Sequence, residues 1–471
     1  MLLLVLLLPA TVPGALWAEE AGEPEHIAQA VGDLEALAAW CHKRKLFRER
    51  NATYEALLAF RPDHKDARKW LKYKQAKDGT WERRGRYKPP RNLKTPGPAL
   101  TEKRQEIGAR YAEAALAWLE APKRGRSPAV RRQVMESIVL VDPNHARARR
   151  ELGEVQTAEG AWLLKESLET PKRRAQLEAA ARDAIAGVAK PRQARPSEAE
   201  NAVGIGWKGI VAGSRARVAS SADAAEATRA HALTEAAFVM FPSIYGAEPP
   251  HLPGLSLLII TSDAERTQLL AKHPSSTKAF QEFGATLSSG WFPQTNIVFA
   301  RSAWPARRLE WATRQPLAAL LRRAYKVRTK HGWAFEGFGL YASYLLCGRR
   351  QTFYVRRTKY GDKTDPKDDL WNRLTADGAD WRKEARTLLA SDRAPNLRLL
   401  LGKEVNTMNT EDMLLAYVFA AWLIEARPER VPGVLRAVAR GRRADDLVEG
   451  QLRMDVDGLM KRLRRWLDET K

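Results

Sequence analysis

Apolar positions in the first third of the chain recur at the spacing of one helix face. Tyr54 is followed three and four residues later by Leu57 and Leu58, and residues 135–139 repeat this spacing with Met, Ile and Val. Side chains three and four residues apart lie on the same side of an α-helix. The pattern therefore predicts two equivalent amphipathic helices in this part of the chain.

The two helices belong to a longer duplicated segment. Residues 54–81 and 135–162 share nine identities over 28 positions at a fixed offset of 81. In both copies a proline follows the helix, and proline favours the first turn of a new helix because its φ is fixed. We expect a histidine to cap this second helix and an alanine to allow close packing. The positions shared by the two turns are Pro62, His64, Ala67, Pro143, His145 and Ala148.

The second copy carries a recognisable motif. Residues 142–153 match the pattern D-P-x-H-x-x-A-R-x-x-L-G throughout, whereas the first copy departs from it at Arg61 and Lys72. The motif resembles that of tetratricopeptide-like repeats, which are helical hairpins that stack on one another. The resemblance implies two repeat units within residues 30–170, with a basic linker at 83–100. In that family such hairpins bind peptides or proteins or form a scaffold, and both roles stay open at this point.

The pattern changes to mixed strands and helices in the second half of the chain. Short apolar runs predict strands, and longer periodic runs predict helices. The strands are expected at 217–220, 255–261 and 296–300, and the helices at 222–240, 264–272 and 316–325. Residues 171–216 are expected to form a helix and a linker. The fold class predicted for the whole chain is mainly α, with N-terminal helical-hairpin repeats and a C-terminal α+β domain over 217–471.

Residues 204–209 fit the G-x-G-x-x-G pattern of dinucleotide-binding turns. Such a turn binds a pyrophosphate only between a strand and the N-terminus of a helix. Here polar residues precede the glycines, and no helical pattern follows them. A dinucleotide site is therefore not predicted, and no cofactor is expected.

Glu336, Gly337 and Tyr341 form an E-G-x-x-x-Y segment within the predicted α+β domain. Together with the mixed strands and helices, this segment resembles the peptidase-MA-like (gluzincin) domains that often follow tetratricopeptide-like repeats in exported bacterial proteins. In that family an H-E-x-x-H helix supplies two zinc-binding imidazoles and a catalytic base, and the later glutamate completes the metal site. Glu336 matches that glutamate.

The helix expected to carry H-E-x-x-H contains no histidine. By spacing, the places of the motif fall on Ala319, Leu320 and Arg323. An arginine that faces Glu336 would replace zinc by a salt bridge, which keeps the fold and removes the catalyst. No catalytic and no metal-binding residue is therefore expected, and the domain is interpreted as a pseudo-metallopeptidase.

Composition and charge add two constraints. The chain has 44% hydrophobic residues and 15 tryptophans, which excludes intrinsic disorder. Its two cysteines, Cys41 and Cys347, are too few for a disulfide framework, and a bridge between them stays open. With 79 basic and 56 acidic residues the net charge is +23, which favours acidic partners. The best candidates for a polyanion surface are Arg322, Arg323, Lys326, Arg328, Lys330, Arg349, Arg350, Arg356 and Arg357.

The N-terminus predicts export. Residues 1–8 are almost entirely leucine, and small residues precede the acidic pair at 19–20, as in a signal peptide over residues 1–18. The alternative is an uncleaved anchor, but the apolar run is shorter than the roughly 20 residues of a membrane-spanning helix. No membrane span is expected in the mature chain.

Three functions follow from these patterns. The first is a non-catalytic exported scaffold that binds a protein partner. The second is an active zinc hydrolase that uses unconventional ligands such as His331, Glu336 and an aspartate. The third is a polyanion-binding protein. The partner and the oligomeric state stay open.

Overall fold

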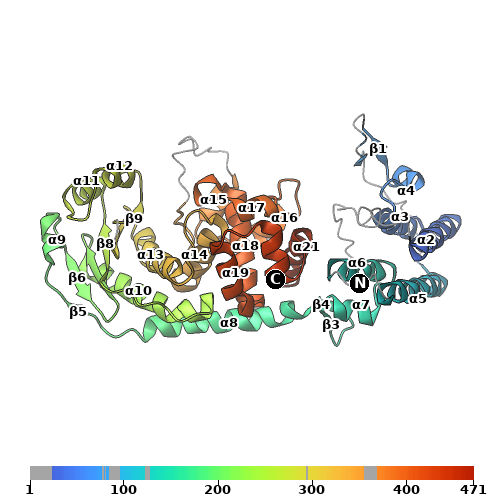
Figure 1. Cartoon of the computed structure of the whole chain (residues 1–471), viewed down its shortest axis with the longest axis horizontal. Helices are drawn as coiled ribbons and strands as arrows, with labels where there is room; N and C mark the ends of the chain where they lie inside the picture. The colour runs from blue at the N-terminus through green and yellow to red at the C-terminus, as the bar shows by residue number, and fades with distance from the viewer. Residues whose placement is uncertain are drawn as a thin grey trace. The chain divides into compact units, whose positions relative to one another are not determined.

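The computed structural model describes residues 24–76, 79, 81–83, 96–121, 128–292, 295–354 and 369–470. The chain is mainly helical with a small mixed sheet, which confirms the coarse fold class. It divides into two compact units, Met1–Lys165 and Glu166–Lys471, coloured blue to cyan and green to red in Figure 1. The predicted signal peptide and most of the basic linker lie outside the described residues.

Unit 1 consists of two similar sets of elements. Each set has two long helices that pack together, a short helix and a two-stranded antiparallel sheet. The first set is α2 (Glu25–Lys43), α3 (Phe47–Phe60), α4 (Lys65–Trp70), β1 (Tyr73–Gln75) and β2 (Trp81–Arg83). The second set is α5 (Pro98–Glu120), α6 (Pro128–Val141), α7 (Ala146–Glu151), β3 (Glu154–Gln156) and β4 (Trp162–Leu164). One hydrophobic core extends through both sets.

The duplicated histidines cap the short helices, as predicted. His64 precedes α4, and its Nδ1 accepts a hydrogen bond from the amide of Ala67 at 3.1 Å. His145 precedes α7 and accepts from the amide of Ala148 at 3.2 Å. Both alanines are fully buried, which explains why no larger side chain occupies these positions.

The second half of each copy differs from the expected helix. Gln75 Nε2 donates to the carbonyl of Gly79 at 3.2 Å, and Gln156 Nε2 donates to that of Gly160 at 3.3 Å, so each pair closes the turn of a β-hairpin. Both glycines have positive φ, +85° and +81°, which other residues rarely adopt. The helix after the proline is therefore only six residues long. The long helical hairpins are formed by α2 with α3 and by α5 with α6.

Unit 2 contains a six-stranded sheet in the order β5-β6-β7-β8-β10-β9. The pairs β7/β8 and β8/β10 are parallel, and the other pairs are antiparallel. The strands are β5 (Arg192–Gln193), β6 (Gly209–Ala212), β7 (Ala216–Ser220), β8 (Leu255–Ile260), β9 (Ser289–Trp291) and β10 (Ile297–Arg301). Strands β5 and β6 lie within the segment 171–216, which therefore contributes to the sheet and is not a linker.

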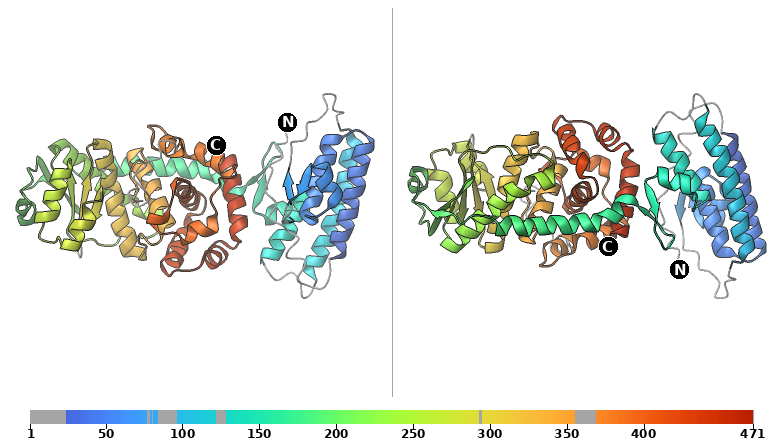
Figure 2. Two further views of the ribbon diagram at one scale, coloured as in Figure 1. Left: turned by 90° about the horizontal axis from the view of Figure 1, so that it is seen from above. Right: turned by 90° about the horizontal axis from the view of Figure 1, so that it is seen from below.

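Helices cover both faces of this sheet (Figure 2). On one face, Val218 and Leu257 pack with residues of α10 (Ala224–Tyr245) and α13 (Pro305–Tyr325). On the other face, Leu258 and Phe299 pack with α11 (Asp263–Lys272) and α12 (Lys278–Gly284). The alternation along each strand thus separates two hydrophobic cores.

Helix α14 (Gly332–Cys347) packs against α10, α13 and C-terminal helices of unit 2. The helix that packs most extensively against it is α18 (Thr410–Ala426). The long helix α8 (Lys165–Ala186) extends along unit 2 (Figures 1 and 2), and Arg174 on it contacts Glu425 on α18 at 3.3 Å. The other elements are α9 (Glu198–Ala202), α15 (Asp369–Thr375), α16 (Trp381–Leu389), α17 (Leu397–Gly402), α19 (Val431–Ala439), α20 (Ala444–Leu452), α21 (Val456–Glu469) and the 3₁₀ turns Val405–Thr407 and Pro428–Arg430.

Three further expectations can be compared with the structure. The glycine-rich segment 204–209 follows α9 and leads into β6, so the strand-turn-helix context of a dinucleotide site is absent there. Cys41 and Cys347 are both free thiols. Among the described residues, no helix is both long and apolar enough to cross a membrane.

Candidate functional site

Helices α13 and α14 bring three buried charged side chains together. Glu310 and Arg314 lie four residues apart on α13 and therefore share one face of the helix. Glu336 lies in the second turn of α14, and Arg314 Nη2 donates a hydrogen bond to its Oε2. None of the three residues is more than 1% exposed. We refer to Glu310, Arg314 and Glu336 as the charge cluster.

The chain segment 351–354 crosses the charge cluster. The amide of Gln351 donates to Glu310 Oε2 at 2.9 Å, and the amide of Thr352 donates to Glu310 Oε1 at 3.2 Å. A buried carboxylate is costly unless it is hydrogen-bonded and paired with a positive charge. The backbone of this segment meets the first requirement for Glu310.

The segment 351–354 also forms hydrogen bonds with Glu336 and Arg314. The amide of Tyr354 donates to Glu336 Oε1 at 2.6 Å, and Arg314 Nη1 donates to the carbonyl of Thr352. The guanidinium carbon of Arg314 lies 4.8 Å from the ring centroid of Tyr354 and 5.6 Å from that of Trp311. The cation is therefore enclosed by a carboxylate, a carbonyl and two aromatic rings.

Burial and charge pairing act against each other in the cluster. Burial raises the pKa of Glu310, although the nearby charge of Arg314 and the amide donors of Gln351 and Thr352 lower it. Burial alone would lower the pKa of Arg314, but the charges of Glu336, Tyr354 and Glu310 outweigh this effect, so the pKa is raised. Arg314 therefore stays cationic in the interior of the unit.

The arginine that faces Glu336 is Arg314, and the prediction of Arg323 is wrong. Arg323 is exposed, nine positions further along α13. Ala319 is half-buried and Leu320 is fully buried, and neither takes part in the charge cluster. The expected salt bridge is present, but at a different position of the helix.

The position of the arginine was predicted wrongly because the start of its helix was predicted wrongly. Pro316 was expected to begin the helix, but it lies inside α13, which begins at Pro305. Proline is most common in the first turn of a helix, so Pro305 and Pro316, eleven residues apart, are both compatible with the start of this helix. The i, i+4 pair of Glu310 and Arg314 after Pro305 is the signal that could have identified the cluster. Nothing in the residue pattern of 351–354 predicts that this segment covers it.

The two other residues of the E-G-x-x-x-Y segment have structural roles. A Cβ atom at Gly337 would lie 2.3 Å from the carbonyl oxygen of Ala416, so glycine permits the close crossing of α14 and α18. Tyr341 is buried, and its hydroxyl donates to Glu425 Oε1 at 3.0 Å. Neither residue contacts the charge cluster through a hydrogen bond in the described part of the chain.

The residues of the charge cluster do not fit a zinc ion. Zinc is held by lone pairs of imidazole, thiolate or carboxylate groups, and a guanidinium offers none. His331 is not a substitute, because its Nδ1 accepts a hydrogen bond from the amide of Arg328 at 3.1 Å, which puts the proton of the neutral ring on Nε2 and leaves no nitrogen lone pair for a metal. Both oxygens of Glu336 accept hydrogen bonds. In the described part of the chain, no group of three or more His, Cys, Asp or Glu side chains could hold a metal ion.

Comparison of the chain with protein-family models, with curated proteins and with solved structures gives no match. What the site can do is therefore inferred from its residues and their contacts. In these contacts Arg314 pairs with Glu336, and both carboxylates accept hydrogen bonds from backbone amides, while Arg314 Nε has no acceptor among the described residues. The cluster joins α13, α14 and the segment 351–354 through specific contacts.

Proposed function

We propose that the chain is a non-catalytic, exported interaction protein, in which tetratricopeptide-like repeats precede a pseudo-metallopeptidase unit. One observation carries the proposal: in the buried interior of unit 2, Arg314 donates to Glu336 and shares one face of α13 with Glu310. Glu310 and Arg314 have the i, i+4 spacing of the two imidazoles in H-E-x-x-H. The guanidinium supplies the positive charge that a metal would otherwise provide to Glu336.

The segment 351–354, which covers the charge cluster, also supports a non-catalytic role. Catalysis by a bound metal needs an open coordination position that water or substrate can reach. Here the amides of Gln351, Thr352 and Tyr354 donate to the two carboxylates, so the chain itself occupies the approach. A protein partner is the remaining role, because stacked helical hairpins present extended surfaces for protein binding.

The test is a comparison of zinc content and peptidase activity in the purified full-length chain and in a designed variant. Wild-type protein is expected to contain far less than one zinc per chain and to leave casein intact. The variant Glu310→His/Arg314→His places two imidazoles one turn apart beside Glu336 and is expected to gain zinc binding. Adding Glu336→Gln to this variant should weaken the zinc binding. Stoichiometric zinc in the wild-type chain would overturn the proposal.

A second candidate function is binding of an anionic polymer. Five cations at the end of α13 and in the loop after it are all exposed, and no carboxylate of the described residues forms an ion pair with any of them. They are Arg322, Arg323, Lys326, Arg328 and Lys330. Of the other candidates, Arg350 is buried and Arg349 pairs with Asp377 at 2.9 Å. Residues 356 and 357 lie outside the described residues.

Salt-dependent retention on immobilised heparin tests this second function. Binding through phosphate or sulfate contacts weakens steeply with salt because counterions are released. The variant Arg322→Gln/Arg323→Gln/Lys326→Gln should then elute at clearly lower salt than the wild type. Lys172→Gln/Lys190→Gln/Arg192→Gln removes the same charge from exposed positions elsewhere and serves as the control. Equal shifts for both variants would show a response to net charge alone.

A further inference from the structure

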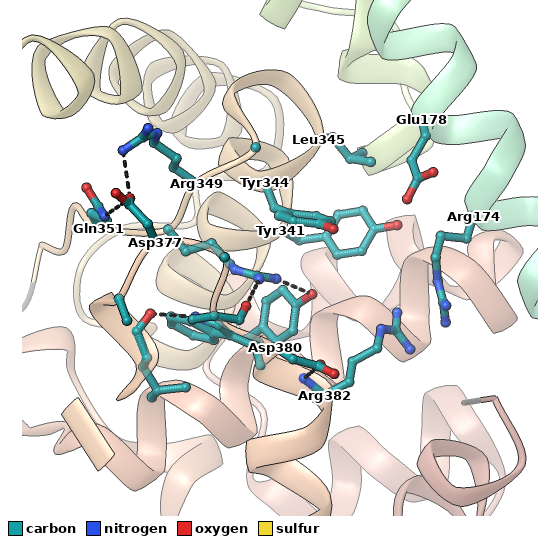
Figure 3. A pocket seen from close by; sticks show the side chains of 18 of the residues that line it. Arg174, Glu178, Tyr341, Tyr344, Leu345, Arg349, Gln351, Asp377, Asp380 and Arg382 are labelled. Carbon is teal, nitrogen blue, oxygen red and sulfur yellow. Dashed lines mark hydrogen bonds and ion pairs between the residues drawn. The ribbon is translucent and has the colours of Figure 1, made fainter. Parts of the chain in front are cut away.

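Unit 2 contains a cavity of about 630 Å³ that is separate from the charge cluster. Its walls come from α8, α14, α15, α16, α18 and the two loop segments 348–351 and 376–380 (Figure 3). None of the three residues of the charge cluster lines it. The volume is within the range of roughly 300–1,000 Å³ that is typical of small-molecule sites.

The deep end of the cavity holds two guanidinium groups against one carboxylate. Glu425 is buried and accepts hydrogen bonds from Tyr341 Oη at 3.0 Å, from Arg174 Nε at 3.3 Å and from Arg382. Arg174 Nη2 and Arg382 Nη1 are also buried, and neither has a hydrogen-bond acceptor among the described residues. A buried donor without an acceptor is destabilising, so these two groups favour an acceptor from outside the chain.

A third cation on the wall is held without a counter-charge. Arg350 donates to Tyr417 Oη at 2.7 Å and to the carbonyl of Ala379 at 3.0 Å. Its guanidinium carbon lies 4.1, 5.0 and 4.9 Å from the ring centroids of Tyr344, Trp381 and Tyr417. No carboxylate of the described residues forms an ion pair with it. The aromatic rings fix the cation in place and leave its charge uncompensated.

Helix α8 adds one face of alternating charge. Arg174, Glu178 and Arg182 are spaced four residues apart and all line the cavity. Figure 3 shows Arg174 and Glu178 on the α8 side of the cavity, opposite Tyr341 and Tyr344. Arg182 is exposed and forms no ion pair within the described part of the chain. Glu178 provides a carboxylate that can accept from an ammonium or amide group of a ligand.

We infer that this cavity binds a small ligand through its carboxylate group, with Arg174 and Arg382 as the carboxylate-binding pair. Guanidinium groups suit this role because they form paired hydrogen bonds to the two oxygens of a carboxylate. Glu178 favours a ligand that also carries a nitrogen donor, as an amino acid or the C-terminal residue of a peptide does. The inference is independent of the proposed function, because no residue of the charge cluster takes part.

Isothermal titration of the full-length chain at low ionic strength tests the inference. The probes are trialanine with a free carboxylate, trialanine amide, glutarate and inorganic phosphate. Binding of trialanine or glutarate but not of trialanine amide supports it. If only trialanine binds, the ligand's carboxylate is the C-terminus of a peptide. If glutarate binds as well, a carboxylate without a peptide is sufficient. Tighter binding of phosphate than of both carboxylates, or no binding of either carboxylate, would overturn it.

Matched variants locate the binding. Arg174→Gln removes one member of the pair and should weaken carboxylate binding by about tenfold, as expected for loss of a charged hydrogen bond. Glu425 keeps its contacts with Arg382 and Tyr341 in this variant, and Arg182→Gln is a second variant at an exposed position. Lys172→Gln removes the same charge from α8 outside the cavity and should bind as the wild type does. Equal affinity in the wild type, Arg174→Gln and Arg182→Gln would contradict the assignment.

Discussion

At the scale of single residues, the charge cluster shows how an interior can hold three charges without a metal. Two carboxylates and one guanidinium are all buried, and three backbone amides complete the hydrogen bonding of the carboxylates. Removing one partner of a buried ion pair costs more than replacing the whole group by neutral residues. The energetic role of Arg314 can therefore be measured.

The variant Arg314→Met should lose about 3–5 kcal/mol of unfolding free energy, because two buried carboxylates lose their counter-charge. The triple variant Glu310→Gln/Arg314→Met/Glu336→Gln should be clearly more stable than Arg314→Met alone, since no unpaired charge remains. Urea unfolding followed by circular dichroism measures both. If the triple variant is the less stable of the two, the cluster does not act as an ionic unit.

A buried carboxylate outside the charge cluster gives unit 2 a defined dependence on pH. Glu235 on α10 accepts from the amides of Arg215 and Ala216 at 2.9 and 3.2 Å, and His231 lies 3.5 Å away. Burial alone would raise the pKa of Glu235, but the contacts with His231 and the Arg215 amide lower it from 4.5 to about 2. A lowered pKa means that the stabilising contribution is complete above about pH 4.5 and is lost as the pH falls towards 2.

Glu235→Gln should therefore be less stable than the wild type at pH 7, and the difference should shrink as the pH falls from 4.5 towards 2. Thermal unfolding at a series of pH values measures this. Glu248→Gln changes an exposed carboxyl and is the control. A stability difference that stays constant down to pH 2 would contradict the assigned pKa.

At the scale of elements, the crossing of α14 and α18 depends on one glycine. Gly337→Ala brings a methyl group against the backbone of Ala416, which cannot move away cheaply, and should cost about 1–3 kcal/mol. Gly450→Ala on α20 is the control, because no atom lies within 4 Å of the added carbon, and it should gain about 0.4–1 kcal/mol. Chemical denaturation of both variants measures the difference. A stable Gly337→Ala protein would show that the two helices can separate without cost.

The elements also show what the sequence could predict. The duplication, the histidine caps and the strands at 216–220, 255–260 and 297–301 follow from local periodicity and turn chemistry, and the structure contains them. Local patterns did not predict β6, because its four residues, Gly209–Ala212, carry too little periodicity. They also misplaced the start of α13, since Pro316 is compatible with a helix start and with a position inside a longer helix.

At the scale of the whole molecule, the excess positive charge divides into groups with different roles. Arg314 and Arg350 are buried and take part in specific contacts. The group at the end of α13 is exposed and without ion pairs among the described residues, so it is suited to bind an anionic polymer. The excess of basic residues behind the net charge of +23 thus includes both buried arginines with specific contacts and exposed surface cations.

The units differ in the kind of function they support. Unit 1 contains the same arrangement of helices and a hairpin twice, and the turn contacts that both copies share serve stability. Unit 2 holds both the charge cluster and the arginine-lined cavity. We therefore propose protein binding as the role of the repeats and carboxylate binding as a property of unit 2.

The zinc content of the purified wild-type chain, measured by mass spectrometry after exposure to one equivalent of zinc and removal of the excess, tests the central claim most directly. Arg314 supplies the charge that would otherwise require a metal, so far less than one zinc per chain is expected, with no change on Glu336→Gln. One zinc per chain in the wild type that is lost in Glu336→Gln would show that Glu336 is a metal ligand, and would contradict the account.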